Sequence, residues 1–188
     1  MKFETSCKAL IKKLIAGVGM FMLVSVAQAE LKVGATAPDF SATAALAGNT
    51  YSFALKEALK KGPVVVYFYP KAFTRGCTIE ATLFAEATEQ FAALNATVIG
   101  VSGDDIDTLK QFSTGPCGGK FAVAADLDRS IMKSYDAALT LMPTVADRIS
   151  YVVTPDFKIL FVHSGMAPDQ HVSETLKALK AWKSKQVK

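Results

Sequence analysis

The stretch VVVYFYPKAFTRGCTIEA, residues 64–81, decides how this chain folds and where its chemistry lies. It begins with the continuous apolar run Val64 to Phe68, which is typical of a strand buried on both faces of a sheet. Pro70 can end this strand, and a loop then leads to Cys77, which we expect in the first turn of a helix. The stretch therefore predicts a strand, a loop and a helix whose N-terminus carries a cysteine.

The chain around this unit alternates between strand and helix patterns. An N-terminal β-hairpin is expected where segments 39–43 and 50–55 flank a turn at Gly48-Asn49. The other expected elements are strands at 97–102 and 121–124, an antiparallel hairpin of 151–153 with 159–162, and helices at 79–94, 104–112 (capped by Asp104), 129–135 and 172–182. This order predicts an α/β fold with a central mixed β-sheet and helices on both faces. Ligand chemistry in such folds lies beyond the carboxyl ends of the parallel strands, which points to the loop after Phe68.

Residues 1–29 have the three parts of a secretory signal peptide. Lysines come first, an apolar stretch follows from Leu14 to Ala27, and the small-residue triplet Ala27-Gln28-Ala29 ends the segment. The apolar stretch is shorter than the ~20 residues of a typical membrane span, and an uncleaved anchor is the alternative interpretation. We expect cleavage after Ala29, which leaves one domain, residues 30–188, that is exported to the periplasm or secreted and is not stably bound to the membrane.

Most of the net positive charge of the chain lies in this leader. The whole chain has a formal net charge of +4, and residues 1–29 contribute four lysines and one glutamate, so the remainder is close to neutral. A near-neutral surface argues against a nucleic-acid partner, which would need a concentrated basic patch.

No metal site is expected, because His163 and His171 have no second ligand at metal spacing. Both are interpreted as structural or surface histidines. His163 could also approach the site from a neighbouring strand.

Two cysteines remain once Cys7 is removed with the leader. An even pair in an exported chain, Cys77 and Cys117, makes a disulfide plausible. An ordinary thiol is only a few per cent thiolate at neutral pH, and a helix N-terminus with a nearby guanidinium shifts it toward the nucleophilic thiolate. Thr74 stands where the hydroxyl of a helix N-cap would face the amide of Cys77. The alternative for Cys77 is an inert buried cysteine.

The pattern Pro70-x-x-x-Thr74-x-x-Cys77 resembles the active-site signature of the peroxiredoxins. The surrounding YFYPKAFTRGCTIEA is similar to their Q-type, or bacterioferritin-comigratory-protein-like, branch. Weaker matches extend over most of the domain, at Ala37-Pro38-Asp39-Phe40, Gly100-Val101-Ser102 and 148–153. The resemblance implies a thioredoxin-like fold and a thiol-dependent peroxidase that reduces hydrogen peroxide and organic hydroperoxides. It implies no cofactor, an external dithiol reductant such as a thioredoxin-like protein, and a monomer or weak dimer.

The resemblance also assigns roles to single residues. Cys77 matches the peroxidatic cysteine that attacks the O–O bond, Thr74 the hydroxyl that bonds substrate and thiolate, and Pro70 the residue that shields the sulfur. Arg148 matches the arginine that supports the thiolate and the polarised peroxide, and Glu80 the carboxylate that holds this arginine. The chemistry agrees, because breaking an O–O bond needs an anionic attacker and donors aimed at the developing charge.

The chain departs from the commonest Q-type pattern at the resolving cysteine. Many members carry it five residues after the peroxidatic one, where this chain has Thr82. We expect Cys117, in the glycine-rich stretch 115–119, to resolve the sulfenic acid through an intramolecular disulfide. A one-cysteine peroxidase with Cys117 idle is one alternative. Others are a thioredoxin-like protein disulfide oxidoreductase, which would normally show Cys-x-x-Cys, and a non-catalytic binding module on the same scaffold.

Overall fold

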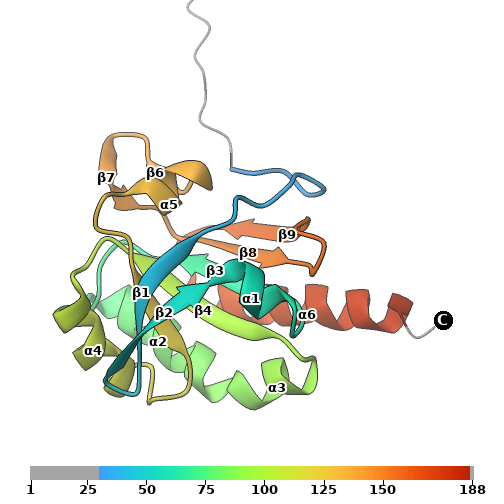
Figure 1. The fold of residues 1–188 in the computed structure, drawn as a ribbon, viewed down its shortest axis with the longest axis horizontal. Helices are drawn as coiled ribbons and strands as arrows, with labels where there is room; N and C mark the ends of the chain where they lie inside the picture. Colours follow the sequence, from blue (N-terminus) through green and yellow to red (C-terminus); the bar gives the residue numbers. More distant parts are fainter. Residues whose placement is uncertain (1–29, 187–188) are drawn as a thin grey trace, which may run out of the picture.

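The protein is described by a computed structural model covering residues 30–186. Its centre is a seven-stranded mixed sheet in the order β2-β1-β5-β4-β3-β8-β9 (Figure 1). The strands are β1 (Ser41–Leu46), β2 (Asn49–Ala54), β3 (Val64–Phe68), β4 (Thr97–Ser102), β5 (Ala122–Ala125), β8 (Ile149–Val153) and β9 (Ile159–Ser164). Strands β3, β4 and β5 are parallel, and β8 pairs antiparallel with β3. The predicted central mixed sheet is confirmed.

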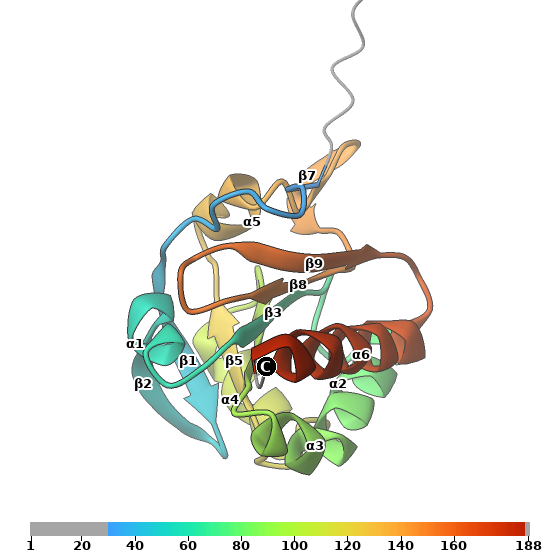
Figure 2. The same cartoon turned by 90° about the vertical axis from the view of Figure 1, so that its right-hand side faces the viewer.

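Helices cover both faces of this sheet (Figure 2). They are α1 (Leu55–Leu59), α2 (Arg75–Glu86), α3 (Thr88–Ala93), α4 (Ile106–Thr114), α5 (Ser130–Ser134) and α6 (Pro168–Gln186). The alternation along β3 shows why: Val64, Val66 and Phe68 pack into one core with α1 and α5, while Val65 and Tyr67 pack into the other with α2, α4 and α6. Every residue of β3 is buried, as its apolar run predicts.

Several expected elements differ in detail from the structure. The first hairpin turns at Ala47-Gly48 rather than Gly48-Asn49, and both turn residues have positive φ (49° and 79°), as a tight two-residue hairpin turn requires. The single helix expected at 79–94 starts earlier and is divided at Ala87 into α2 and α3. The hydroxyl of Thr88 donates to the carbonyl of Phe84 at this point, a type of bond that bends helices.

Two further differences lie in the loops. The cap of α4 is Asp105 rather than Asp104, because the Asp105 carboxylate accepts from the amide of Thr108 at 2.8 Å. A small second sheet, β6 (Ala138–Leu139) with β7 (Met142–Ala146), and helix α1 were not predicted. Within the described residues no helix combines the length and apolarity needed to cross a membrane. The predicted signal peptide lies outside the described residues.

Candidate active site

Cys77 occupies the first turn of α2, as predicted. The helix begins at Arg75, and its first hydrogen bond runs from the amide of Thr78 to the carbonyl of Thr74, at 2.8 Å. The unpaired amides of a helix N-terminus favour an anion near them. The Cys77 side chain is buried, with only 1% of its surface exposed, so the sulfur lies in a largely water-free position.

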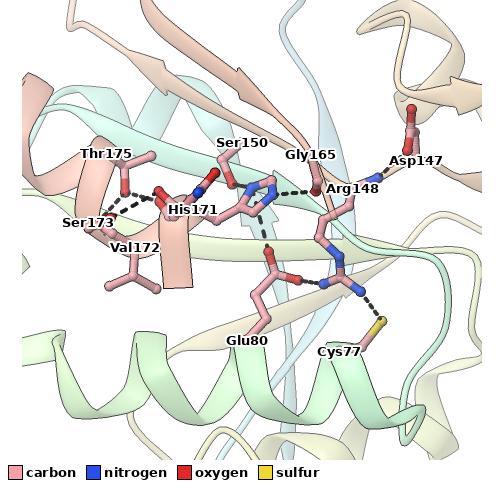
Figure 3. A network of polar contacts seen from close by, with 11 residues as sticks. Cys77, Glu80, Asp147, Arg148, Ser150, Gly165, His171, Val172, Ser173 and Thr175 are labelled. Atoms are coloured by element: carbon pink, nitrogen blue, oxygen red, sulfur yellow. Dashed lines mark hydrogen bonds and ion pairs between the residues drawn. The ribbon is translucent and has the colours of Figure 1, made fainter. Parts of the chain in front are cut away.

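Arg148 contacts the Cys77 sulfur from the start of β8, the strand next to β3. The residue directly precedes β8, and the antiparallel register pairs Ile149 with Phe68, so Arg148 lies at the carboxyl end of β3. Its guanidinium donates from Nη2 to Cys77 Sγ at 3.4 Å and from Nη1 to Glu80 Oε2 (Figure 3). Both Arg148 and Glu80 are buried. The predicted grouping of Cys77, Arg148 and Glu80 is thus present as direct contacts.

Gly76 makes this approach possible. A Cβ built at this position would lie 2.9 Å from Arg148 Nη2, closer than ordinary side-chain contacts. The guanidinium therefore lies directly against the backbone of the first turn of α2. No sequence pattern indicates this role of Gly76, because a glycine beside a loop is equally typical of a turn.

Glu80 lies one turn after Cys77 on α2 and connects Arg148 to a buried histidine. Burial raises the pKa of Glu80 to about 8, although the neighbouring Arg148 acts in the opposite direction. The second carboxylate oxygen, Oε1, has no hydrogen-bond partner and lies 3.7 Å from Nδ1 of His171. The His171 ring bonds Ser150 Oγ through Nδ1 at 2.9 Å and the carbonyl of Gly165 through Nε2 at 2.8 Å.

His171 was interpreted from the sequence as a structural or surface residue, and the structure places it beside the site. Burial lowers its pKa to about 4. It belongs to α6, more than ninety positions after Cys77, and no local pattern marks it, since it stands near the start of an ordinary amphipathic helix. His163, which the sequence allowed near the site, stacks edge-on against it with ring centroids 4.6 Å apart.

The loop before Cys77 carries the other two signature residues. Pro70 is half-buried after the end of β3, and Thr74 is exposed at the N-cap of α2. The expected capping bond is absent: Thr74 Oγ1 donates to the carbonyl of Lys71 at 3.0 Å, so the hydroxyl turns back along the loop. Asp104, expected to cap α4, instead accepts from the amide of Ala72 at 2.7 Å and thereby fastens this loop to the end of β4.

Cys117 lies in the loop between α4 and β5 and is a free, buried thiol, as is Cys77. Both cysteines belong to the same apolar cluster on the α2 side of the sheet. Burial raises the pKa of Cys117 to about 12, so this thiol is protonated at neutral pH in the structure described. Among residues 30–186 no group of three or more His, Cys, Asp or Glu side chains is arranged to hold a metal ion.

Comparison with known proteins identifies the family. The model of the AhpC/TSA family matches residues 33–162, more than half of the chain. This range includes Cys77, Glu80, Cys117 and Arg148. The chain belongs to the AhpC/TSA family. This membership confirms the peroxiredoxin resemblance seen in the active-site signature.

Individual relatives agree with the family. The chain is 34% identical over 123 residues to chloroplastic peroxiredoxin Q of Oryza sativa subsp. japonica, covering 65% of this chain and 56% of that one. It is 34% identical over 125 residues to chloroplastic peroxiredoxin Q of Sedum lineare, covering 66% and 67%. The match thus spans little more than half of the rice protein.

Solved structures with similar folds are peroxiredoxins. Peroxidoxin BcpB of Mycobacterium tuberculosis superimposes with a TM-score of 0.73 at 28% identity, covering 80% of this chain and 97% of that one. A PrxQ mutant of Xylella fastidiosa superimposes with a TM-score of 0.72 at 25% identity, covering 82% and 99%. The thioredoxin-like α/β fold expected from the sequence is therefore confirmed.

Proposed function

We propose that this protein is a thiol-dependent peroxidase that reduces hydrogen peroxide and organic hydroperoxides. One observation carries the proposal: the Arg148 guanidinium donates to Cys77 Sγ at 3.4 Å, at a helix N-terminus, with both side chains buried. A buried thiolate needs an adjacent positive charge, and a hydroperoxide needs donors for the charge that develops when its O–O bond breaks. The same guanidinium serves both needs.

The reaction begins with attack of the Cys77 thiolate on one peroxide oxygen. The S–O bond forms while the O–O bond breaks, so sulfur is oxidised to a sulfenic acid and the second oxygen leaves as an alkoxide or hydroxide that takes up a proton. Thr74 is assigned to bond the substrate, Pro70 to shield the sulfur, and Glu80 to hold Arg148. The exposed position of Thr74 at the mouth of the loop fits a group that meets incoming substrate.

Cys117 completes the cycle in this proposal. Its thiol condenses with the Cys77 sulfenic acid, which forms an intramolecular disulfide and releases water, and an external dithiol then restores both thiols by exchange. Burial of both sulfurs in one apolar cluster supports the pairing. Because Cys117 is buried in the loop between α4 and β5, we expect this loop to open as the disulfide forms.

We also propose a cellular location, a branch of the family and an oligomeric state for the enzyme. We propose that residues 1–29 direct export, so that the enzyme works in the periplasm or outside the cell and draws on a reductant available there. The peroxiredoxin Q relatives support a place in the Q-type branch. A monomer or weak dimer is the proposed state.

Stopped-flow peroxide consumption with a generic dithiol tests this function in three proteins. The wild type is expected to consume peroxide, Cys77→Ser to lose the activity completely, and Cys117→Ser to react once and then stall or over-oxidise. Peroxide consumption by Cys77→Ser would move the chemistry to another residue. Sustained turnover by Cys117→Ser would instead indicate a one-cysteine enzyme.

A further inference from the structure

The two nitrogens of His171 have partners of different kinds. Nε2 faces the carbonyl oxygen of Gly165, which can only accept, so Nε2 carries a hydrogen in every state. Nδ1 faces the hydroxyl of Ser150, which can donate to a bare nitrogen or accept from a protonated one. The ring is therefore held in a position where it can gain or lose a proton at Nδ1 without losing a hydrogen bond.

That variable nitrogen faces a carboxylate oxygen with no other partner. Glu80 Oε1 is buried, accepts no hydrogen bond, and lies 3.7 Å from Nδ1, while Oε2 is engaged by Arg148. A buried carboxylate oxygen without a hydrogen bond costs free energy, and it costs more when the carboxylate is charged. A single proton on Oε1, or on Nδ1 beside it, reduces this cost.

The net charge of the buried network also favours one proton on the pair formed by Glu80 and His171. Arg148 is always positive, so with the Cys77 thiolate the network is neutral only if Glu80 and His171 together hold one proton. With no proton on this pair the buried network would carry a net negative charge, which is costly far from water.

We infer that Glu80 and His171 hold one proton at the Oε1–Nδ1 contact while Cys77 is a thiolate, and release it when Cys77 is oxidised. The inference rests on the proposed function. The Cys77 thiolate, one hydroperoxide and the stored proton give the Cys77 sulfenic acid and an alcohol or water, so the leaving oxygen takes the stored proton. The network is neutral before the step and after it, when Arg148 faces an ionised Glu80. His171 touches no reacting atom and acts through Glu80.

The surroundings favour Glu80 as the carrier of this proton. Burial raises the pKa of Glu80 and lowers that of His171. Besides Glu80, the charged or titratable groups that face His171 are Arg148, which disfavours an imidazolium; Asp147, which favours one; and His163, whose ring packs against it. A proton on Oε1 would leave Oε2 free to accept from Arg148, the arrangement that the structure shows.

Proton uptake during a single oxidation tests this inference. A pH indicator records uptake from solvent when one equivalent of hydroperoxide oxidises Cys77, with Cys117→Ser present in every protein so that the reaction stops at the sulfenic acid. We expect no net uptake with Glu80 intact and uptake of about one proton per Cys77 with Glu80→Gln, which has no proton to release. Thr175→Val, a buried change on the same helix as His171, is the control and should behave like the parent.

A second measurement needs no substitution in the network. Infrared and ¹⁵N NMR spectra of the Cys117→Ser protein at neutral pH should show one proton on the pair before oxidation, as a carboxylic acid band or an imidazolium, and none after it. Equal uptake by the parent and Glu80→Gln, or a carboxylate beside a neutral imidazole already in the reduced protein, would overturn the inference. Absence of a sulfenic acid at Cys77 in all proteins would instead contradict the proposed function.

Discussion

At the scale of single residues, the site depends on the planar shape of one guanidinium. Arg148 presents two nitrogens in different directions, one to Cys77 Sγ and one to Glu80 Oε2, and it is buried between them. A fork of fixed geometry loses little entropy for each bond that it forms. The contact geometry, rather than the charge alone, should therefore matter for activity.

Arg148→Lys tests this point. Lysine keeps the positive charge but offers a single ammonium, which cannot contact the sulfur and the carboxylate in the same way. We expect the second-order rate constant for peroxide reduction to fall by about 10²-fold, as for loss of one preorganised donor. Stopped-flow kinetics at neutral pH measure it, and near-normal kinetics would show that Arg148 does not serve the reaction.

Gly76→Ala perturbs the same guanidinium from the helix side. The added methyl group would lie 2.9 Å from Arg148 Nη2 and must displace it from the sulfur. Because a misplacement of about 1 Å can cost about 10²-fold, we expect a loss of 10- to 10²-fold in peroxide reduction. The displacement costs stability, but alanine favours the helix over glycine by about 1 kcal/mol. Because these two effects oppose each other, thermal stability should change little.

The exposed substitution Thr82→Ala on the same helix is the matched control for Gly76→Ala. It should leave the kinetics unchanged. Equal activity of Gly76→Ala and this control would mean that the close approach of Arg148 to the helix backbone is not needed.

Glu80 should make stability depend on pH. The pKa of Glu80 is raised from 4.5 to about 8 in the folded protein, so folded Glu80 keeps a proton that it releases in the unfolded chain, and its contribution to the free energy of unfolding falls as pH rises through this range. Between pH 7 and 8, the free energy of unfolding of the parent relative to that of Glu80→Gln should therefore decline by up to ~1.4 kcal/mol per pH unit. Denaturant titrations of Glu80→Gln should lack this contribution, and an identical slope in both proteins would contradict the raised pKa.

At the scale of elements, strand pairing brings distant residues to one point. The pairing of β3 with β8 carries Arg148 to the end of the strand that leads to Cys77, and α6 places His171 behind Glu80. The signature predicted Cys77, Glu80 and Arg148 through family resemblance. It could not predict His171, Ser150 or Gly76, whose roles arise only when three segments meet in space.

In the proposed two-cysteine cycle, we expect the loop of Cys117 to rearrange. In the structure it is closed by the bonds from the amide of Cys117 to the carbonyl of Phe112, at 3.2 Å, and from Gly119 to Ser113, at 2.8 Å. Gly118 and Gly119 have positive φ values of 56° and 68°, which glycine adopts without strain. Opening would break these backbone bonds and expose the buried Cys117 side chain, and the glycines allow the backbone to move without strain.

We expect one equivalent of peroxide to link Cys77 and Cys117 within one chain. Disulfide formation requires Cα atoms within about 7 Å of each other, which the opened loop must allow. Peptide mapping under non-reducing conditions should show the two cysteine peptides joined in the monomer, with faster hydrogen exchange in segment 112–120 than in the reduced protein. An over-oxidised Cys77 beside a free Cys117 would exclude the two-cysteine cycle.

At the scale of the whole molecule, the central sheet and its longer helices were predictable, while short and irregular elements were not. The apolar run of β3 and the helical spacing after Cys77 identify their elements because each buries a regular face. The second sheet, of β6 and β7, is short and only partly buried, so it has no regular burial pattern. The predicted hairpin turn is one residue too late because Ala47 adopts a positive φ, which is uncommon for alanine and is not expected from the sequence.

The most direct test of the account is to locate the oxygen transferred from peroxide. Cys117→Ser is treated with one equivalent of hydrogen peroxide in the presence of a reagent that traps sulfenic acids, and the peptides are analysed by mass spectrometry. We expect the trap on Cys77, and we expect Cys77→Ser, treated in the same way, neither to bind the trap nor to consume peroxide. Peroxide consumption with an unmodified Cys77 would contradict it.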